Sequence, residues 1–304
     1  MGLFARYDDN PVIEASAWPG EVNAVFNPAA VEFAGETLLL VRVEDRAGLS
    51  YLGLARSADG LGGWTVEPER ALLPDLRSEE ERFGIEDPRI TRLGEEWAIV
   101  YTGFSTDGPL VLLATTRDFR SYERHGAVVP PRNKDAALFP DRFDGRYTLL
   151  HRPMSGLAGA GAGIWISWSP DLRHWGDHRP VLAVGEAGSW ASHKVGVGPP
   201  PLLTPEGWLV LYHGVRVTAS GSIYRAGLAL LERERPERVL ARSADWVLGP
   251  EAPYERVGDV GNVVFPCGWI LGGDGDTLRV YYGAADTSVC VATASLAALL
   301  GPLG

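Results

Sequence analysis

A repeated pattern of apolar segments and glycine turns runs through most of the 304-residue chain. In each copy, a polar or proline-containing stretch leads into a short apolar segment, a glycine turn, a second apolar segment and a polar exit. Short apolar segments on either side of a glycine turn are typical of paired β-strands. The five copies span residues 27–45, 87–103, 137–153, 200–214 and 262–286.

The spacing of these hairpins predicts a β-propeller. Successive copies begin roughly 50 to 65 residues apart, which is the length of a four-stranded blade with its loops. A second pattern lies between them: a small polar residue, an aspartate two positions later and then an aromatic residue. This pattern predicts a turn after a third strand, with the aromatic ring packed between sheets. Its copies begin at Ser57, Thr116, Ser169 and Ser243.

We therefore expect an all-β fold in which one five-bladed β-propeller forms a single domain over residues 1–304. Radial repetition protects the strand edges of such a fold. The alternative is a β-sandwich in which the self-similarity is accidental. Residues 295–300, S-L-A-A-L-L, predict a short C-terminal helix.

The ends of the hairpins predict where the chemistry lies. A hairpin returns the chain to the end at which it started, so the residues before its first strand and after its second share one face. Charged side chains at strand ends near a propeller axis are costly to bury without partners, and their convergence predicts a binding site. The alternative is that they pair among themselves and only seal the channel. The residues concerned are Asn27, Arg42, Glu44, Asp45, Glu86, Asp87, Tyr101, Lys134, Asp135, His151, Arg152, Lys194, His213, Asn262 and Asp286.

One acidic residue in this set is a candidate for proton transfer. Asp87 lies in the stretch F-G-I-E-D-P-R, where Pro88 fixes the chain direction just before an apolar run begins. A carboxyl group at the start of a strand suits a general acid. Its alternative role is that of an ion-pair partner for Arg42 or Arg89.

Four basic residues from two consecutive repeats predict an anion site. Several cations directed at one place require an anion, and phosphate supplies the charge with a fixed geometry. The alternative is that each forms a separate salt bridge with one of the excess acidic residues. Tyr224 could stack on a sugar ring, although packing also explains a tyrosine at a strand end. The four basic residues are Lys134, Arg152, Lys194 and His213.

Composition and charge argue against several classes of function. The net charge of −11 argues against a surface that binds nucleic acid or an anionic membrane. The sequence contains no P-loop, G-x-S-x-G or H-E-x-x-H motif and no cluster of histidines and carboxylates, so we expect no metal and no organic cofactor. Cys267 and Cys290 are expected to be free thiols in a reducing compartment. Without a signal-peptide core or a bilayer-length apolar run, the protein is expected to be cytoplasmic.

At these residues the chain resembles glycoside hydrolase family 130, the mannoside phosphorylases and related mannosidases on a five-bladed propeller. The resemblance extends from F-N-P at Phe26 to Y-Y-G-A-A-D, which ends at Asp286. Its most specific motifs are G-I-E-D-P-R, N-K-D-A-A-L-F-P followed by L-H-R-P, H-K-V-G-V-G-P-P followed by G-W-L-V-L-Y-H-G, and G-N-V-V-F-P-C-G.

The resemblance implies an inverting phosphorolysis of β-mannosides, with inorganic phosphate as co-substrate and α-mannose 1-phosphate as product. It implies that Asp87 is the acid, that its proton passes through a hydroxyl of the mannosyl ring, and that phosphate attacks the anomeric carbon from the opposite face. The implied phosphate ligands are Lys134, Arg152 and Lys194 with His213 nearby, and Arg132 is the alternative to Lys134. The predicted substrate-binding residues are Asn27, Arg42, Glu86, Tyr224, Asn262 and Asp286.

The chemistry of the nucleophile favours the same interpretation. An inverting hydrolase needs a second carboxylate to activate water, whereas a phosphorylase needs positive charge to orient an anion. The alternatives are a β-mannosidase that pairs Asp87 with Glu44 or Glu86, and a non-catalytic carbohydrate-binding propeller. The linkage and the acceptor sugar are expected to depend on rim loops at 156–163 and 216–223. The sequence leaves open whether the chain forms a homo-oligomer.

Overall fold

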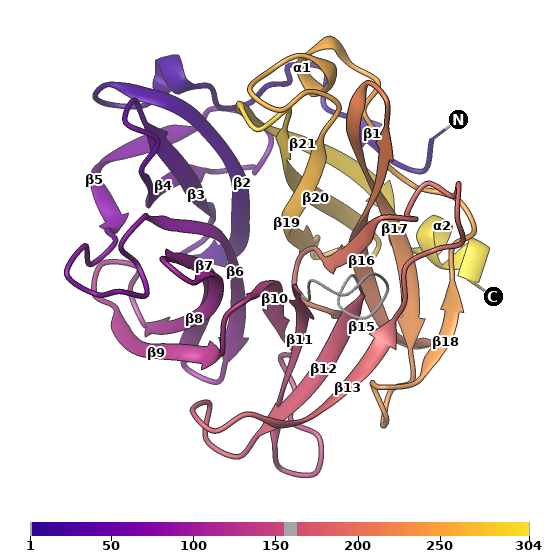
Figure 1. The fold of residues 1–304 in the computed structure, drawn as a ribbon. Helices are drawn as coiled ribbons and strands as arrows, with labels where there is room; N and C mark the ends of the chain where they lie inside the picture. Colours follow the sequence, from indigo (N-terminus) through magenta and orange to yellow (C-terminus); the bar gives the residue numbers. More distant parts are fainter. Residues whose placement is uncertain (1, 155–162, 304) are drawn as a thin grey trace.

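The computed structural model describes residues 2–154 and 163–303 and confirms the predicted propeller. Five antiparallel sheets follow one another around a central axis in chain order (Figure 1). Each predicted hairpin supplies two neighbouring strands of one sheet, so the repeat in the sequence is the repeat of the blades. This arrangement excludes the β-sandwich.

The strands of each blade are numbered outward from the axis. The first blade consists of β2 (Val22–Phe33), β3 (Glu36–Asp45), β4 (Ser50–Ser57) and β5 (Thr65–Leu72). The second consists of β6 (Ile85–Leu93), β7 (Glu96–Ser105), β8 (Gly108–Thr116) and β9 (Glu123–Val129). The third consists of β10 (Asn133–Leu138), β11 (Tyr147–Pro153), β12 (Ile164–Ser169) and β13 (Gly176–Leu182).

The last two blades depart slightly from this plan. The fourth consists of β14 (Lys194–Val197), β15 (Leu202–Thr204), β16 (Gly207–Thr218), β17 (Gly221–Leu231) and β18 (Val239–Arg242), and both β14 and β15 pair with β16. The fifth consists of β19 (Val264–Leu271), β20 (Thr277–Ala284), β21 (Ser288–Ser295) and the N-terminal strand β1 (Ala5–Arg6). The helices are η1 (Ala15–Ala17), α1 (Pro253–Arg256), α2 (Leu296–Leu300) and η2 (Gly301–Leu303).

The pairing of β1 with β21 closes the ring. Arg6 lies opposite Ala292 in this antiparallel pair. Its guanidinium binds the fully buried carboxylate of Glu255, with 2.7 Å between Nε and Oε1. The Tyr282 hydroxyl donates to the same oxygen at 2.8 Å. Backbone pairing and a buried ion pair therefore hold the first strand on the last blade.

The hydrophobic core is divided among the gaps between blades. One apolar cluster fills each gap, and a small sixth cluster lies around Phe265. Leu38 and Leu40 face the second blade, whereas Leu39 and Val41 face the fifth. Because successive side chains of a strand point to opposite faces, a blade that is buried on both faces requires an unbroken apolar run.

Three inner strands carry a β-bulge at the same place. The register shifts at this place in each of the pairs β2–β3, β6–β7 and β10–β11, and β2–β3 has a second shift between Val22 and Ala24. The bulged residues adopt left-handed backbone angles, which asparagine and aspartate tolerate better than most residues with a side chain. A bulge redirects a side chain out of the regular alternation, here toward the axis. The three residues are Asn27, Asp87 and Asp135, with φ of 47°, 49° and 51°.

The predicted aspartate turns occur in three blades. Oδ1 of Asp59, Asp118 and Asp171 accepts hydrogen bonds from the N–H groups two and three residues further on. The fourth turn was predicted wrongly, because Ser243 follows β18, the fourth strand of its blade. There its hydroxyl accepts a hydrogen bond from the Leu228 N–H at 3.0 Å. An aspartate turn is a local structure and is not tied to one strand of a blade.

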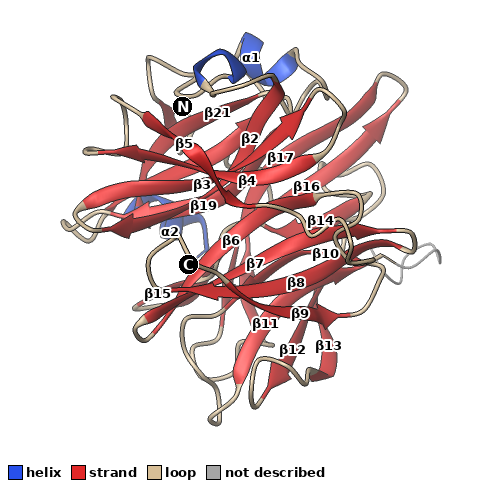
Figure 2. Cartoon of the chain, turned by 90° about the vertical axis from the view of Figure 1, so that its left-hand side faces the viewer, coloured by secondary structure: helices blue, strands red, loops and turns tan. Residues whose placement is uncertain are grey.

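The predicted C-terminal helix is α2, and the Ser295 hydroxyl accepts from the Ala298 N–H at its start. Residues 216–223, predicted as a rim loop, instead extend the β16–β17 ladder as far as the pair Thr218 and Gly221. Figure 2 shows this hairpin as a long ribbon that projects past its neighbours. Residues 156–162 of the other predicted rim loop lie outside the described residues. Among the described helices, none has the length and apolarity needed to cross a membrane.

Candidate active site

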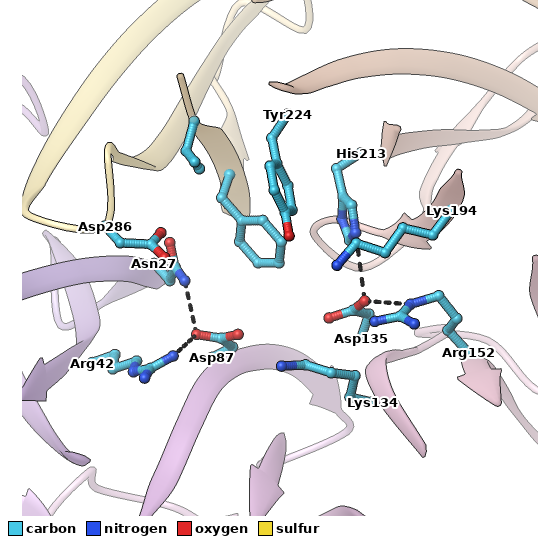
Figure 3. Close-up of a pocket in the computed structure, with 12 residues that line it drawn as sticks. Asn27, Arg42, Asp87, Lys134, Asp135, Arg152, Lys194, His213, Tyr224 and Asp286 are labelled. Atoms are coloured by element: carbon cyan, nitrogen blue, oxygen red, sulfur yellow. Dashed lines mark hydrogen bonds and ion pairs between the residues drawn. The ribbon is translucent and has the colours of Figure 1, made fainter. Parts of the chain in front are cut away.

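A polar cavity lies at the centre of the ring, where strands of all five blades meet (Figure 3). Its volume of about 100 Å³ accommodates several water molecules or a small anion. The residues that were assigned a role in the reaction all line it except Glu86 and Asn262. Of the other residues predicted to converge at the axis, Asp135 lines the cavity, whereas Glu44, Asp45, Tyr101 and His151 do not. The lining residues are Asn27, Arg42, Asp87, Lys134, Asp135, Arg152, Lys194, His213, Tyr224, Val263, Phe265 and Asp286.

Asp87 is fixed on one side of this cavity. Its Oδ1 accepts hydrogen bonds from Asn27 Nδ2 at 2.8 Å and from Arg42 Nη1 at 3.1 Å. Burial acts to raise the pKa of Asp87, but the charges of Arg42 and Lys134 outweigh burial and hold the pKa below its usual range. Asp87 therefore carries a negative charge at neutral pH. It is both the ion-pair partner of Arg42 and a group that faces the cavity.

Arg89, the other predicted ion-pair partner, does not bind the Asp87 carboxylate. Its Nη1 donates to the backbone carbonyl of Asp87 at 2.6 Å. Its other nitrogens reach across the axis to the carbonyls of Val197 and Gly198 in the fourth blade, at 3.2 and 3.1 Å. This buried guanidinium links two blades and does not line the cavity.

A second carboxyl group shares the side of Asp87. Asp286 follows β20 and lies beside Asn27 in Figure 3. Burial, together with the negative charge of Asp87, raises the pKa of Asp286 to about 7. Two neighbouring carboxyl groups thus have pKa values on opposite sides of the usual range, as expected for like charges in one cavity. Near neutral pH, Asp286 is therefore within the range in which it titrates, whereas Asp87 is ionised.

Three cationic side chains lie across the cavity from Asp286. The Lys134 ammonium is 3.5 Å from Glu86 Oε2, and Arg152 Nε is 2.7 Å from Asp135 Oδ2. The Lys194 ammonium lies 4.9 Å from the centre of the Tyr224 ring. Within residues 2–154 and 163–303, Lys194 forms no ion pair. The separate salt bridges considered as an alternative therefore exist for two of these cations and not for Lys194.

His213 lines the same side but is not a fourth cation. Burial lowers the pKa of His213 to about 3, against the opposing effect of Asp135. The imidazole is neutral at physiological pH, so the prediction of a positive charge here is wrong. It packs at 4.6 Å between ring centres against Phe265, a lining residue that the sequence analysis did not identify.

Asp135 lines the cavity as the hairpin ends predicted, but the sequence analysis assigned it no role. Its carboxylate lies between Arg152 and His213, and Oδ2 is 3.5 Å from His213 Nε2. The sequence did contain a signal, since Asp135 occupies the same place in its repeat as Asn27 and Asp87.

Two predicted residues contribute from outside the cavity. Glu86 binds Arg42 at 3.1 Å and Lys134 at 3.5 Å, so it holds the two cations on either side of Asp87. The backbone carbonyl of Asn262 accepts a hydrogen bond from the Tyr224 N–H at 3.0 Å. Asn262 thus positions Tyr224 and does not itself line the cavity.

Of the two alternatives Arg132 and Lys134, only Lys134 lines the cavity. Arg132 is exposed, and its Nε donates to the carbonyl of Asp107 at 3.1 Å. Lys134 points into the cavity toward Asp87 (Figure 3). Residues two positions apart in a strand point to the same face. This does not apply to Arg132 and Lys134, because β10 begins at Asn133 and Arg132 lies before it.

Comparison with known proteins gives consistent matches over almost the whole chain. The sequence model of glycoside hydrolase family 130, described as beta-1,4-mannooligosaccharide phosphorylase, matches residues 6–302. The beta-1,2-mannobiose phosphorylase of Listeria innocua is 41% identical over 342 residues, covering 93% of this chain and 94% of the relative. The 1,2-beta-oligomannan phosphorylase of Thermoanaerobacter sp. (strain X514) is 37% identical over 300 residues, covering 94% and 95%.

A solved structure agrees with these matches. The complex of the Listeria innocua enzyme with beta-1,2-mannobiose superimposes with a TM-score of 0.90 at 34% identity, covering 99% of both chains. The blades, the cavity and the sequence motifs around Asp87, Lys134 and Lys194 all fall within the matched range. The chain therefore belongs to glycoside hydrolase family 130.

Proposed function

We propose that the protein is an inverting β-mannoside phosphorylase. In this reaction a phosphate oxygen forms a bond to C1 of the mannosyl unit as the bond from C1 to the glycosidic oxygen breaks. The leaving oxygen gains a proton, and the product is α-mannose 1-phosphate. The observation that carries the proposal is that three cationic side chains, Lys134, Arg152 and Lys194, lie across the cavity from Asp286 and line it together with Asp87.

The cations supply what this nucleophile needs. Phosphate is already an anion, so the protein has to concentrate and orient it and does not have to deprotonate it. Lys134, Arg152 and Lys194 are the proposed ligands. Lys194 has no carboxylate partner among the described residues, which leaves its full charge for an anion in the cavity.

Asp87 is the proposed acid, and phosphate binding prepares it for that role. With its pKa below the usual range, Asp87 holds no proton in the absence of the anion. A phosphate bound to Lys134 offsets the charge that stabilises the carboxylate, so the pKa of Asp87 rises when the nucleophile arrives. Asp87 then takes up a proton from solvent and gives it to a mannosyl hydroxyl, which passes its own proton to the leaving oxygen, as the family resemblance implies. Asn27, Arg42, Tyr224 and Asp286 are the proposed mannosyl ligands.

Hydrolysis is the weaker candidate because none of the described carboxylates across the cavity from Asp87 is suited to activate water. Asp286, with a pKa of about 7, lies on the same side as Asp87. Glu44 and Glu86 both bind Arg42, at 3.5 and 3.1 Å, and neither is among the lining residues. Asp135 also faces the cavity. Burial acts to raise its pKa, but the charges of Arg152 and Lys134 outweigh burial and hold the pKa far below its usual range. A carboxylate with so low a pKa is a poor general base.

The proposal is tested by incubating the protein with a panel of β-mannosyl disaccharides, with and without inorganic phosphate. Because the two curated relatives described above act on β-1,2-mannosides by name, β-1,2-mannobiose is the first substrate, followed by β-1,4- and mannosyl-glucose compounds. Mannose 1-phosphate that forms only with phosphate supports phosphorolysis. Free mannose at the same rate without phosphate would make the protein a β-mannosidase. Binding of a sugar without either product would favour a non-catalytic propeller.

A further inference from the structure

We propose that Asp135 makes the anion site selective for phosphate by accepting a hydrogen bond from the P–OH group of hydrogen phosphate. Anions of similar size without a proton, such as sulfate, are then excluded by the same carboxylate. This inference rests on the proposed use of phosphate as nucleophile, and it assigns a specificity role to a residue that the reaction itself does not require.

The contacts of Asp135 leave one of its oxygens for a ligand. Oδ2 binds Arg152 Nε at 2.7 Å and lies 3.5 Å from His213 Nε2. Oδ1 is buried and has no hydrogen-bond partner among the described residues. The residue is only 1% exposed and lines the cavity. A buried oxygen without a donor is costly, so a ligand that donates a hydrogen bond is favoured here.

The charge of Asp135 restricts which ligand can donate. Burial would raise its pKa, but Arg152 and the neighbouring cations keep the group ionised, and an ionised carboxylate can only accept. A bare oxyanion would meet repulsion from Oδ1. The cations Lys134 and Lys194, which line the same cavity, nevertheless favour an anion. An anion that also carries a hydrogen satisfies both conditions, and phosphate near neutral pH is such an anion, whereas sulfate is not.

The backbone and the neighbouring strand hold the carboxylate in this position. Asp135 is fixed at the bulge of β10 with a φ of 51°. On the facing strand β14, a Cβ added to Gly196 would lie 2.5 Å from Asp135 Oδ2 and 2.5 Å from His213 Cε1. The absence of a side chain at Gly196 thus makes room for the acid and the imidazole to lie together. Oδ1 cannot turn away from an anion without breaking the bond to Arg152.

The test compares the wild type with Asp135→Asn and Glu86→Gln. Asparagine retains an oxygen that can bind Arg152, and it presents an N–H group to the cavity in place of Oδ1, the oxygen without a hydrogen-bond donor. Glu86→Gln removes an equal charge near Lys134 but from a residue outside the lining. For each protein, the KM for phosphate and the competitive inhibition constant of sulfate are measured in the phosphorolysis reaction.

The quantity that decides is the ratio of the sulfate inhibition constant to the phosphate KM. In Asp135→Asn this ratio should fall at least about tenfold, because the carboxylate that repels sulfate is replaced by an amide that can donate a hydrogen bond to it. In Glu86→Gln both constants should change together and the ratio should stay the same. An unchanged ratio in Asp135→Asn overturns the proposal, as does a fall of equal size in Glu86→Gln.

Calorimetric titration of the wild type with sodium phosphate, arsenate and sulfate provides a readout that needs neither turnover nor a variant. Phosphate and arsenate, which both carry a proton, should bind at least about tenfold more tightly than sulfate. Equal binding of all three anions would refute the role of Asp135. If the wild type shows this selectivity but forms no mannose 1-phosphate, the anion site stands and the proposed reaction fails.

Discussion

Replacing Asp87 by asparagine removes the proposed acid with little change in shape. The Oδ1 of asparagine can accept the same hydrogen bonds from Asn27 and Arg42, now at 2.8 and 3.1 Å. Arg42 keeps its ion pairs with Glu86 and Glu44, so it is not left without a carboxylate partner. We therefore expect the variant to fold and to bind its sugar.

The expected loss of turnover follows from the role of the proton. General acid catalysis contributes about 100- to 10,000-fold, and each tenfold step corresponds to about 1.4 kcal/mol of activation free energy. Asp87→Asn should therefore lower kcat on a mannosyl disaccharide at least ~100-fold, or about 2.7 kcal/mol. On dinitrophenyl β-mannoside, whose leaving group needs no proton, the loss should be less than about tenfold.

The assay measures phosphate-dependent mannosyl transfer with both substrates, by release of mannose 1-phosphate and by dinitrophenol absorbance. Asp141→Asn is the matched control, because Asp141 is an exposed aspartate in the connection between β10 and β11. It should retain full turnover. A near-normal rate of Asp87→Asn on the disaccharide would refute the assignment. An equal loss on both substrates would show that Asp87 positions the sugar and does not deliver a proton.

Three further predictions concern the rest of the cavity. Arg152→Ala and Lys194→Ala should each raise the apparent KM for phosphate about tenfold or more and the KM for the sugar less, and equal increases would argue against an anion site. Gly196→Ala places a Cβ 2.5 Å from the Asp135 carboxylate and should cost about 1–3 kcal/mol of unfolding free energy, measured by denaturant titration. Burial and the adjacent negative charge raise the pKa of Asp286 to about 7, so between about pH 4 and pH 7 the folded state holds a proton that the unfolded chain has released. The stability of the wild type should consequently fall more from pH 5 to pH 8 than that of Asp286→Asn, and parallel pH profiles would contradict the shifted pKa.

The fold was accessible from the sequence because both faces of each blade are buried. The run E-T-L-L-L-V at 36–41 places alternate side chains in two different interblade clusters, and the same unbroken apolar runs recur in every repeat. The predicted loop at 216–223 failed for a different reason. Its polar residues indicated a surface position, which is correct, but strand pairing depends on the partner strand and not on burial.

The site was predictable as far as charge and strand position determine it. Lys134 and Lys194 reach the cavity because each lies at the start of the innermost strand of its blade. The protonation state of His213 depends on how completely its ring is buried, which residue types do not reveal. The importance of Asp135 depends on a bulge, which shifts the register by one residue and is invisible in a simple alternation of apolar and polar positions.

The repeated bulge also bears on how such a protein can diverge. Asn27, Asp87 and Asp135 share one backbone conformation, and asparagine and aspartate have almost the same size. A single nucleotide change interconverts their codons, so mutation can alter the charge of the cavity by one unit while the blades remain as they are. Ancestral and descendant enzymes on this scaffold can therefore differ in the polarity of their reaction centre with little disturbance of packing. On this scaffold, substitutions at the bulges can therefore change the chemistry of the cavity without changing the packing that stabilises the blades.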